Sequence, residues 1–244
     1  MNWDDATAAY MRSDYATALR EFRTLAEQGD ADAQYTLGTM YYRGQGVPEN
    51  DAKSAKWYRM AAEQGHASAQ NDLGAHYENG TGVPQSYAEA LKWFSKAAEQ
   101  GDAKAQFSLG VLYDDGRGVP QNNAEAVNWY RKAADQGFAD AQHNLGVMYR
   151  KGDGVPQDYA EAVNWYRKAA EQGFANAQHN LGFMYEKGMG VPEDYVMAFM
   201  WLSLAKAHGD KMAWDLDIVK KDMNTDKIAK AQALAAEWLE KHNN

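Results

Sequence analysis

The sequence lacks cysteine altogether, and it has few prolines and no long apolar stretch. Without cysteine the chain has neither a disulfide framework nor thiolate chemistry, an absence that fits any cellular compartment. The longest apolar run, Val196 to Leu202, is far shorter than the roughly 18 residues that a membrane-spanning helix needs. We therefore expect no membrane insertion.

The chain also lacks a block of basic residues. Its formal net charge is −9, and Lys and Arg are spread along its whole length. This balance argues against nucleic acid or an anionic membrane as the main partner. The opening Met1-Asn2-Trp3-Asp4-Asp5 has no basic and apolar leader, so no signal peptide is expected.

What the sequence does have is a repeat of 36 residues. All 5 prolines and all 21 glycines fall in its register. The repeat is marked by five leucines: Leu37, Leu73, Leu109, Leu145 and Leu181. A glycine follows each leucine directly, and a tyrosine lies four residues after each leucine. A fixed period of about 20 to 50 residues is typical of solenoids and other repeat arrays.

Each repeat predicts two helices, which we call the A helix and the B helix. In the first repeat the A helix is expected near 31–43, and its apolar residues follow a helical period. The Gly44-x-Gly46-Val47-Pro48 loop follows, with positive φ expected at the glycines. The B helix then starts after an N-cap residue and ends at Gly65. The five expected N-caps are Asn50, Ser86, Asn122, Asp158 and Asp194.

One glycine of each repeat, Gly38 in the first, falls inside the A helix. Glycine costs about 1 kcal/mol there relative to alanine. Because this cost recurs at the same place in five repeats, we expect another helix to approach so closely that no side chain fits.

These features predict an all-α fold, a right-handed α-solenoid of antiparallel helix pairs forming a single repeat domain over 1–244. An N-terminal capping half-unit is expected at 1–29 and C-terminal capping helices at 210–244, near 210–221 and 226–241. The full repeats between them are expected at 30–65, 66–101, 102–137, 138–173 and 174–209.

The motif A-Q-x-x-L-G-x-x-Y, then G-x-G-V-P, then A-x-x-W-Y/F-x-x-A-A-x-Q-G, resembles the Sel1-like repeat, a relative of the tetratricopeptide repeat. The resemblance covers residues 30 to 209 in five copies, and the tail from Asp222 to Trp238 resembles the ending of bacterial members. It implies a non-enzymatic scaffold or adaptor in protein complexes. Many bacterial relatives are exported, so the resemblance implies either a mature periplasmic or secreted protein or a cytoplasmic one.

Aligned with the tetratricopeptide pattern, the A helices line a concave groove, and the residues at the groove positions differ between repeats. Aromatic and arginine side chains, which tend to dominate interface energies, occur among them. The candidate partner-binding residues are Tyr35, Thr39, Tyr42, Asn71, Glu78, Phe107, Val111, Asp114, His143, Val147, Arg150, His179, Phe183 and Glu186. The hypothesis is that a protein or peptide lies along this groove; the alternative is an ordinary solvated surface.

No metal site, catalytic residue or cofactor is expected. His143 and His179 occupy equivalent places one repeat apart, and packed helices lie about 8–10 Å from each other, too far for both to bind one ion at about 2 Å. The adjacent Asp114 and Asp115 do not face each other on a helix, so they make a poor acid/base pair.

The fifth B helix differs from the others because polar positions become apolar. Met197, Met200 and Leu204 form a stripe along one side of it. Two interpretations remain open: the C-terminal helix covers the stripe, which we favour, or the stripe pairs two copies of the chain. A monomer is therefore expected, with a homodimer through the C-terminal region as the alternative.

Two other functions compete with the scaffold. One is a hydrolase or a binder of a cell-wall-related ligand, because one cysteine-rich branch of the resembled family has been linked to β-lactams; this sequence lacks the cysteine pairs of that branch. The other is a self-associating structural protein. The sequence itself does not name the partner.

Overall fold

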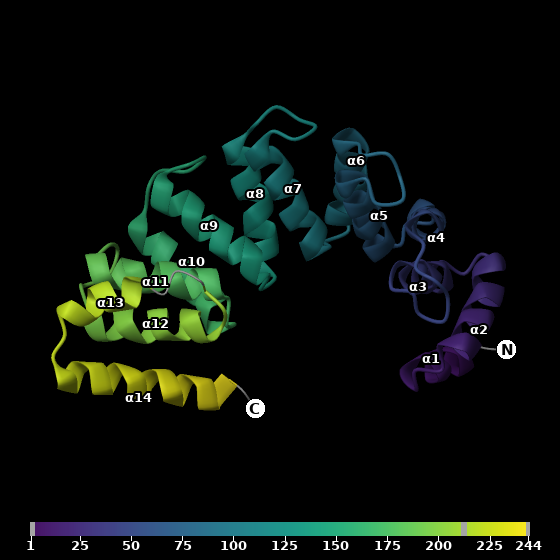
Figure 1. Cartoon of the computed structure of the whole chain (residues 1–244). Coiled ribbons are helices and arrows are strands. Elements are labelled where there is room, and N and C mark those ends of the chain that lie inside the picture. The colour runs from purple at the N-terminus through teal and green to yellow at the C-terminus, as the bar shows by residue number, and fades with distance from the viewer. Residues whose placement is uncertain (1–2, 211–213, 243–244) are drawn as a thin grey trace. The chain divides into compact units, whose positions relative to one another are not determined.

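The computed structural model describes residues 3–210 and 214–242, and within these ranges the regular secondary structure consists of helices joined by turns and loops (Figure 1). The helices are α1 Trp3–Met11, α2 Tyr15–Glu27, α3 Ala31–Tyr42, α4 Asp51–Glu63, α5 Ala67–Asn79, α6 Tyr87–Glu99, α7 Ala103–Asp115, α8 Asn123–Asp135, α9 Ala139–Lys151, α10 Tyr159–Glu171, α11 Ala175–Lys187, α12 Tyr195–Ala207, α13 Trp214–Lys221 and α14 Thr225–His242. This confirms the all-α class.

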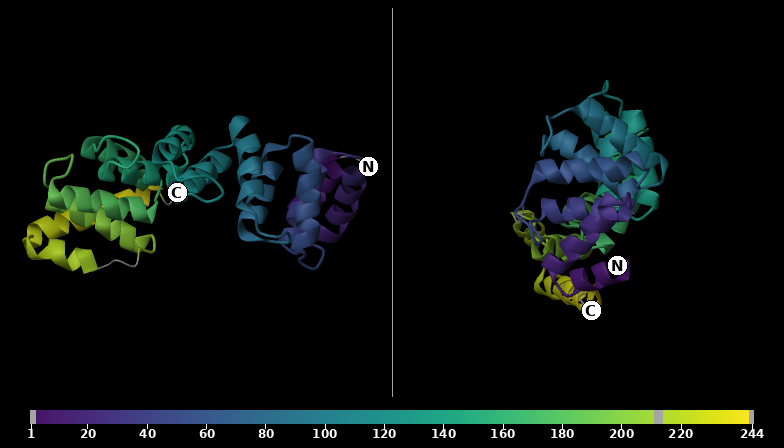
Figure 2. Two further views of the ribbon diagram at one scale, coloured as in Figure 1. Left: turned by 90° about the horizontal axis from the view of Figure 1, so that it is seen from above. Right: turned by 90° about the vertical axis from the view of Figure 1, so that its right-hand side faces the viewer.

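The chain divides into two compact units, Met1–Gln121 and Asn122–Asn244, here called unit 1 and unit 2. Within each unit, helices that follow one another in the sequence pack side by side (Figure 2). In the full repeats the odd-numbered helices α3 to α11 are the A helices and the even-numbered helices α4 to α12 are the B helices. In the N-terminal half-unit, α1 and α2 take these two roles. The expectation of one domain over the whole chain stays a prediction.

The B helices begin where the sequence predicts. Each of the five expected N-cap residues adopts an extended backbone, and its side chain accepts a hydrogen bond from a backbone N–H in the first turn. Asn50, for example, accepts from the N–H of Lys53 at 2.9 Å. The side chain of Asp14 likewise accepts a hydrogen bond from the N–H of Thr17 in the first turn of α2, although the backbone of Asp14 is not extended.

The glycine inside each A helix marks a close approach to the B helix of the same repeat. A Cβ placed on Gly38 would lie 2.6 Å from the ring of Tyr58, and one on Gly146 would lie 2.7 Å from the ring of Tyr166. Both distances are too short for a carbon–carbon contact. The predicted reason for the glycine is therefore confirmed at these positions.

The second glycine of each loop joins successive repeats. Gly82 has φ +69°, and a Cβ there would lie 2.2 Å from the carbonyl carbon of Asp51, in the first turn of the preceding B helix. Gly154 (φ +72°) meets the backbone of Asn123 in the same way, at 2.3 Å. The loop therefore rests directly on the backbone of the previous repeat, in a conformation that favours glycine.

Buried glutamines make a second connection between repeats. The amide of Gln142 donates to the carbonyl of Ala134 in the preceding B helix at 3.1 Å and accepts from the amide of Gln172 in its own repeat at 2.8 Å. Gln34 and Gln70 make equivalent pairs of bonds. These glutamine side chains are almost fully buried, and a buried polar group without a hydrogen bond would lower the stability of the fold. Each of these bonds therefore gives a buried amide its hydrogen-bond partner.

At the C-terminus α14 packs along α12. Met200 and Leu204 are buried there together with Ala235, while Met197 is partly buried against the same cluster. The beginning of the tail helix expected near 210–221 includes residues 211–213, which lie outside the described part of the chain; α13 is described from Trp214. No helix among the described residues is long and apolar enough to span a bilayer.

Candidate binding face of unit 1

The A helices of unit 1 present two adjoining pockets that share Tyr35 and Thr39. One pocket is polar, with a volume of about 280 Å³, and is bounded by α3, α4, α5 and α7. The other is apolar, with a volume of about 230 Å³, and is bounded by α1, α2 and α3. Together they form a hollowed surface that runs across successive A helices. We call this surface the unit 1 binding face.

The polar pocket is built around a carboxylate that is withdrawn from solvent. Asp72 of α5 accepts a hydrogen bond from the side-chain amide of Asn71 at 3.0 Å, and Tyr35 lines the same pocket. The hydroxyls of Thr39 and Tyr58, which line the same pocket, lie 3.2 Å apart. The remaining lining residues are Tyr42, Arg43, Ala75, His76 and Lys104.

Burial controls the protonation of this pocket. It raises the pKa of the Asp72 carboxyl, although Asn71, Tyr35 and Lys104 oppose the shift. It also raises the pKa of Tyr58 to about 12 and moves the pKa of Tyr35 upward, in both cases mainly by desolvation. The phenols are therefore neutral hydrogen-bonding groups at physiological pH.

His76 is the least expected member of the pocket. Its side chain is 5% exposed, its Nδ1 lies 2.7 Å from the carbonyl oxygen of Thr81, and its ring packs edge-on against Tyr58. Burial lowers its pKa, so the folded chain holds this imidazole neutral.

This burial predicts a loss of stability in mild acid. The unfolded state, with a pKa of about 6.5, takes up a proton that the folded state resists, so the contribution of His76 to stability falls as the pH drops below about 6.5. His76→Met, which restores the residue type found at this place in Met40 and Met148, should show a smaller fall in the urea midpoint between pH 7.5 and 5.5. An identical pH dependence in both proteins would contradict this assignment.

The apolar pocket is lined mainly by aromatic rings. Trp3 and Tyr10 of α1 both pack edge-on against Phe22 of α2, with ring centroids 5.2 and 6.3 Å apart. Trp3 is 37% exposed although it is one of the largest apolar side chains. An accessible aromatic surface beside a polar pocket is a common feature of protein-binding sites.

The structure brings together only some of the residues predicted for the groove of unit 1. Tyr35, Thr39 and Tyr42 line the polar pocket, and Tyr42 is 47% exposed. Asn71 is buried beside Asp72 and supports it. Glu78 is half-buried and faces Arg117 at 3.8 Å, whereas Phe107, Val111 and Asp114 are half-buried residues of α7 outside both pockets.

In unit 2 the predicted groove residues are tied into local contacts. The Nε2 of His143 accepts a hydrogen bond at 2.9 Å from the side-chain amide of Asn180, and burial lowers the pKa of this histidine. His179 is 8% exposed and lies 2.7 Å from Asp210. Arg150 donates to the hydroxyl of Tyr166 at 3.3 Å.

The other three predicted residues of unit 2 are partly buried. Val147 and Phe183 pack against the apolar core of this unit. Glu186 pairs with Lys187 at 2.7 Å. His179 and Arg150 are likewise engaged in contacts within the chain.

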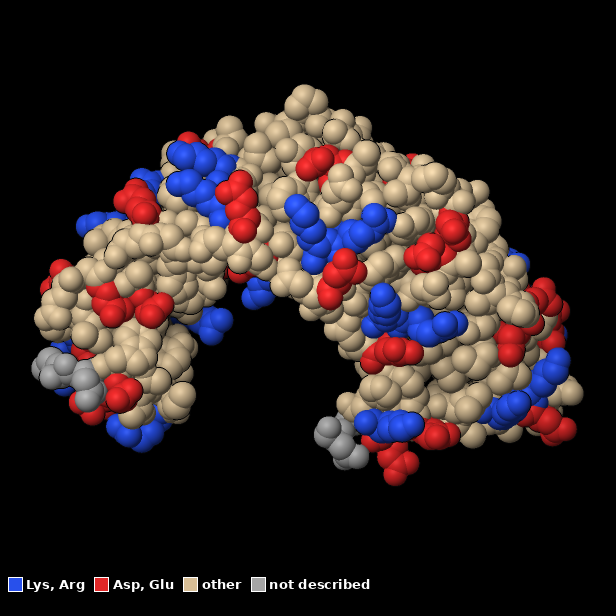
Figure 3. Space-filling view, turned by 180° about the vertical axis from the view of Figure 1, so that it is seen from behind, with Lys and Arg blue, Asp and Glu red and all other residues tan. Residues whose placement is uncertain are grey.

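Charge and metal chemistry add little to this picture. On the face shown in Figure 3, positive and negative side chains are interspersed and neither sign forms a continuous patch. Among residues 3–210 and 214–242, no group of three or more His, Asp or Glu side chains is arranged to hold a metal ion.

Comparison with known proteins agrees with the repeat architecture. The profile of the Sel1 repeat matches residues 31–66, 67–102, 103–138, 139–174 and 175–210. These boundaries begin one residue later than the repeats expected above. Because the matches cover most of the chain, this protein belongs to the Sel1 repeat family, whose members are generally non-catalytic protein-interaction scaffolds.

Solved structures support the same assignment. A Sel1 repeat protein from Oxalobacter formigenes is 36% identical, with a TM-score of 0.84 and 98% of each chain covered. A Sel1 repeat protein from Klebsiella pneumoniae (23% identity, TM-score 0.51, 82% of this chain and 98% of that one) and an immunity protein from Pseudomonas aeruginosa (21%, 0.53, 84% and 82%) share the fold. Comparison with curated proteins found no match.

Sequence reasoning missed several pocket residues, among them Tyr58, Asp72, His76 and Lys104. For His76 the signal was present, because the other four repeats have methionine or leucine at that place. A histidine on an otherwise apolar position of a repeat indicates that the local surroundings have changed. The aromatic pocket at Trp3 lies in the half-unit, where the repeat pattern offers no comparison.

Proposed function

We propose that this protein is an interaction scaffold that binds an extended segment of a partner protein along its A helices. The observation that carries the proposal is the pair of pockets on unit 1 that share Tyr35 and Thr39. Adjoining pockets of different polarity can accept neighbouring side chains of one peptide, which is how extended segments are commonly recognised.

The lining residues favour a peptide with an apolar side chain close to a polar one. The apolar side chain would enter the pocket formed by Trp3, Tyr10 and Phe22. The polar one would meet the hydroxyls of Tyr35 and Tyr58 and the charged groups of Asp72, Arg43 and Lys104. Phe107, Val111 and Asp114 of α7 are proposed to extend the contact within unit 1, and the groove residues of unit 2 are proposed as a separate contact surface. This binding role requires no cofactor.

The coverage of Met200 and Leu204 by α14 supports the cap interpretation of the apolar stripe, and with it a monomer. A hydrolase is not supported by any arrangement of nucleophile and base found among the described residues of the pockets. The scaffold therefore remains the function that the geometry supports best.

The proposal is tested with a displayed library of random peptides selected on the intact protein. Peptides retained by the wild type should bind Tyr35→Ala at least tenfold more weakly, because truncating an aromatic anchor typically costs 2 kcal/mol or more, about 30-fold in affinity. Lys104→Met should weaken the same peptides by severalfold, since Lys104 is exposed at the rim of the polar pocket. Affinities can be measured by fluorescence anisotropy.

A matched control is Lys56→Met, which removes an exposed lysine from the B helix α4 outside the unit 1 binding face. This variant should bind the selected peptides as the wild type does. Circular dichroism would establish that Tyr35→Ala remains folded. Equal affinity of all four proteins, or a library that yields no specific peptide, would contradict binding at this face.

A further inference from the structure

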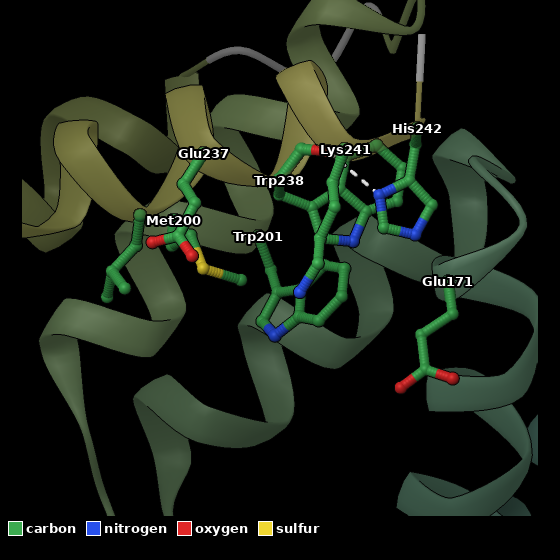
Figure 4. A pocket seen from close by; sticks show the side chains of 8 residues that line it. Glu171, Met200, Trp201, Glu237, Trp238, Lys241 and His242 are labelled. Carbon is green, nitrogen blue, oxygen red and sulfur yellow. Dashed lines mark hydrogen bonds between the residues drawn. The ribbon is translucent and has the colours of Figure 1, made fainter. Parts of the chain in front are cut away.

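A pocket with different chemistry lies in unit 2, against the C-terminal helix. It has a volume of about 370 Å³ and is lined by residues of α10, α12 and α14. Figure 4 shows Trp201 and Trp238 at its centre, with the carboxylates of Glu237 and Glu171 on opposite sides of the two indoles. We call this the C-terminal pocket.

Aromatic rings form its walls. Trp201 of α12 and Trp238 of α14 meet at an interplanar angle of 66°, with ring centroids 6.3 Å apart. His242 stacks on Trp238 at 3.9 Å and an angle of 10°, and its Nδ1 lies 2.8 Å from the carbonyl oxygen of Trp238. Met200 and Leu234 complete an apolar lining. Trp201 is only 5% exposed and Trp238 is partly buried, and both indoles line the pocket at this steep angle.

Earlier repeats show what the tryptophan at this place of the B helix attracts. The ammonium group of Lys168 lies 3.8 Å from the ring centroid of Trp165, one turn before it on the same helix. The same contact joins Lys132 to Trp129 at 3.8 Å and Lys96 to Trp93 at 4.6 Å, whereas the first repeat has Met60 at the position of the lysine. In the fifth repeat the corresponding lysine is replaced by Leu204, which is fully buried. Trp201 has therefore lost the cation of its own repeat.

The surrounding charges favour a replacement cation. Glu171 and Glu237 contribute two carboxylates, against the single ammonium of Lys241. Lys241 extends from α14 toward Trp201 in Figure 4, so the chain already directs one positive group at the pocket. A cation held between carboxylates and indole faces gains from both charge attraction and the ring quadrupoles.

We propose that the C-terminal pocket binds a trimethylammonium group. Its methyl groups match the apolar lining of Met200, Leu234 and the indoles, and its charge matches Glu171 and Glu237. A primary ammonium is more strongly hydrated and gains less from this lining, whereas quaternary ammonium groups are well suited to aromatic cages. Such a group could belong to a free compound such as choline or to a trimethylated lysine of a partner, and the experiment separates the two.

The test compares choline with its neutral carbon analogue 3,3-dimethylbutan-1-ol, using the intact protein and isothermal titration calorimetry. Choline should bind about 3- to 30-fold more tightly than the analogue, the range expected for a cation–π contribution. Binding should also shift the indole N–H signals of Trp201 and Trp238 in NMR spectra. Equal affinity for the two compounds, or unchanged signals of both tryptophans, would overturn the proposal.

Three variants sharpen the result. Glu237→Gln should weaken choline binding severalfold by removing one carboxylate, and Trp238→Phe should weaken it through the smaller ring while keeping an aromatic side chain against α12. Lys241→Met should strengthen it, because a competing positive charge is removed. If Lys241→Met instead weakened binding, the pocket would not be a cation site. Tyr35→Ala, which alters the unit 1 binding face, should leave choline binding unchanged.

The source of the group is decided with a trimethyllysine peptide. Affinity at least tenfold higher than that of choline would assign the trimethylammonium group to a protein partner, since residues beside the lysine would then add contacts. Equal or lower affinity would assign the pocket to a free compound. Both results retain the trimethylammonium chemistry, and binding of neither ligand would refute it.

Discussion

Gly154→Ala is expected to lower the free energy of unfolding by about 2–5 kcal/mol. The alanine must adopt the positive φ of this loop, which costs about 1–2 kcal/mol. Its Cβ would also lie 2.3 Å from the carbonyl oxygen of Asn123, a backbone atom that does not move aside as a flexible side chain does. Forced contacts of this kind typically add 1–3 kcal/mol. Urea unfolding followed by circular dichroism measures the change.

The control for this prediction is Gly137→Ala. Gly137 also has a positive φ, +87°, but a Cβ there meets nothing within 4 Å. The Gly137→Ala variant should therefore lose about 1–2 kcal/mol of free energy of unfolding, which is the cost of placing alanine at a positive φ. If the two variants were equally stable, the contact between the loop and the preceding B helix would contribute nothing to the joining of repeats.

Gln142→Leu should cost about 1–3 kcal/mol of stability. The leucine has a similar size and suits a buried position, yet it removes two hydrogen bonds, one to the carbonyl of Ala134 and one from the amide of Gln172. Both partners keep another bond, since Ala134 also accepts from the N–H of Gly137 and Gln172 also donates to the carbonyl of Lys168, so the loss is that of two ordinary hydrogen bonds, about 0.5–1.5 kcal/mol each. Gln157→Leu is the control: Gln157 is exposed and bonds only the carbonyl of Arg150, so less than about 1 kcal/mol should be lost.

Gln142→Glu separates hydrogen bonding from shape at the same site. An ionised carboxylate would face the carbonyl oxygen of Ala134, whereas the protonated acid can donate to it. The pKa of the new group should therefore be raised in the folded state, and the variant should lose stability relative to the wild type as the pH rises above about 4.3, the ordinary value for glutamate. A stability difference that stays constant from pH 4 to 7 would contradict this role of the amide.

Much of the fold could be predicted because the repeat places the same chemistry at the same position several times. The N-cap residues, such as Asn50, and the glycine loops specify where helices begin and how the chain turns. Gly38 and its equivalents predicted close helix approach, and the contact with Tyr58 confirms it. The buried glutamine was visible as a motif letter, but its two hydrogen bonds depend on helices that come together only in the folded chain.

The candidate site was harder to predict because its important residues depart from the repeat. Tyr35, Thr39 and Tyr42 were found from the groove pattern, and they line a pocket. Asp72 and His76 were missed, since their burial results from packing among three helices. His179 was assigned to the groove, but it is almost buried against Asp210, a residue beyond the end of its repeat.

The C-terminal pocket likewise could not be predicted from the sequence. The sequence predicts that the last helix has an apolar face, and Ala235 does pack against Leu204. It does not predict that Trp238 stops 6.3 Å from Trp201 and leaves a hollow between carboxylates. Periodicity identifies the side of a helix that is covered, whereas the shape of the remaining space depends on individual side chains.

The contacts made by Gly154 and Gln142 have a consequence for how such chains change length. The boundaries at Gln34, Gln70 and Gln142 use the same loop glycine and the same pair of glutamine bonds, so a duplicated or deleted block of one repeat would recreate an identical boundary. The last boundary is different, because His208 takes the place of the second glutamine and bonds Gln178 at 2.8 Å. Whole repeats can therefore be inserted in the interior of the array without changing the contacts between repeats. At the C-terminal end an added repeat would have to replace both this histidine and the helix that covers Trp201.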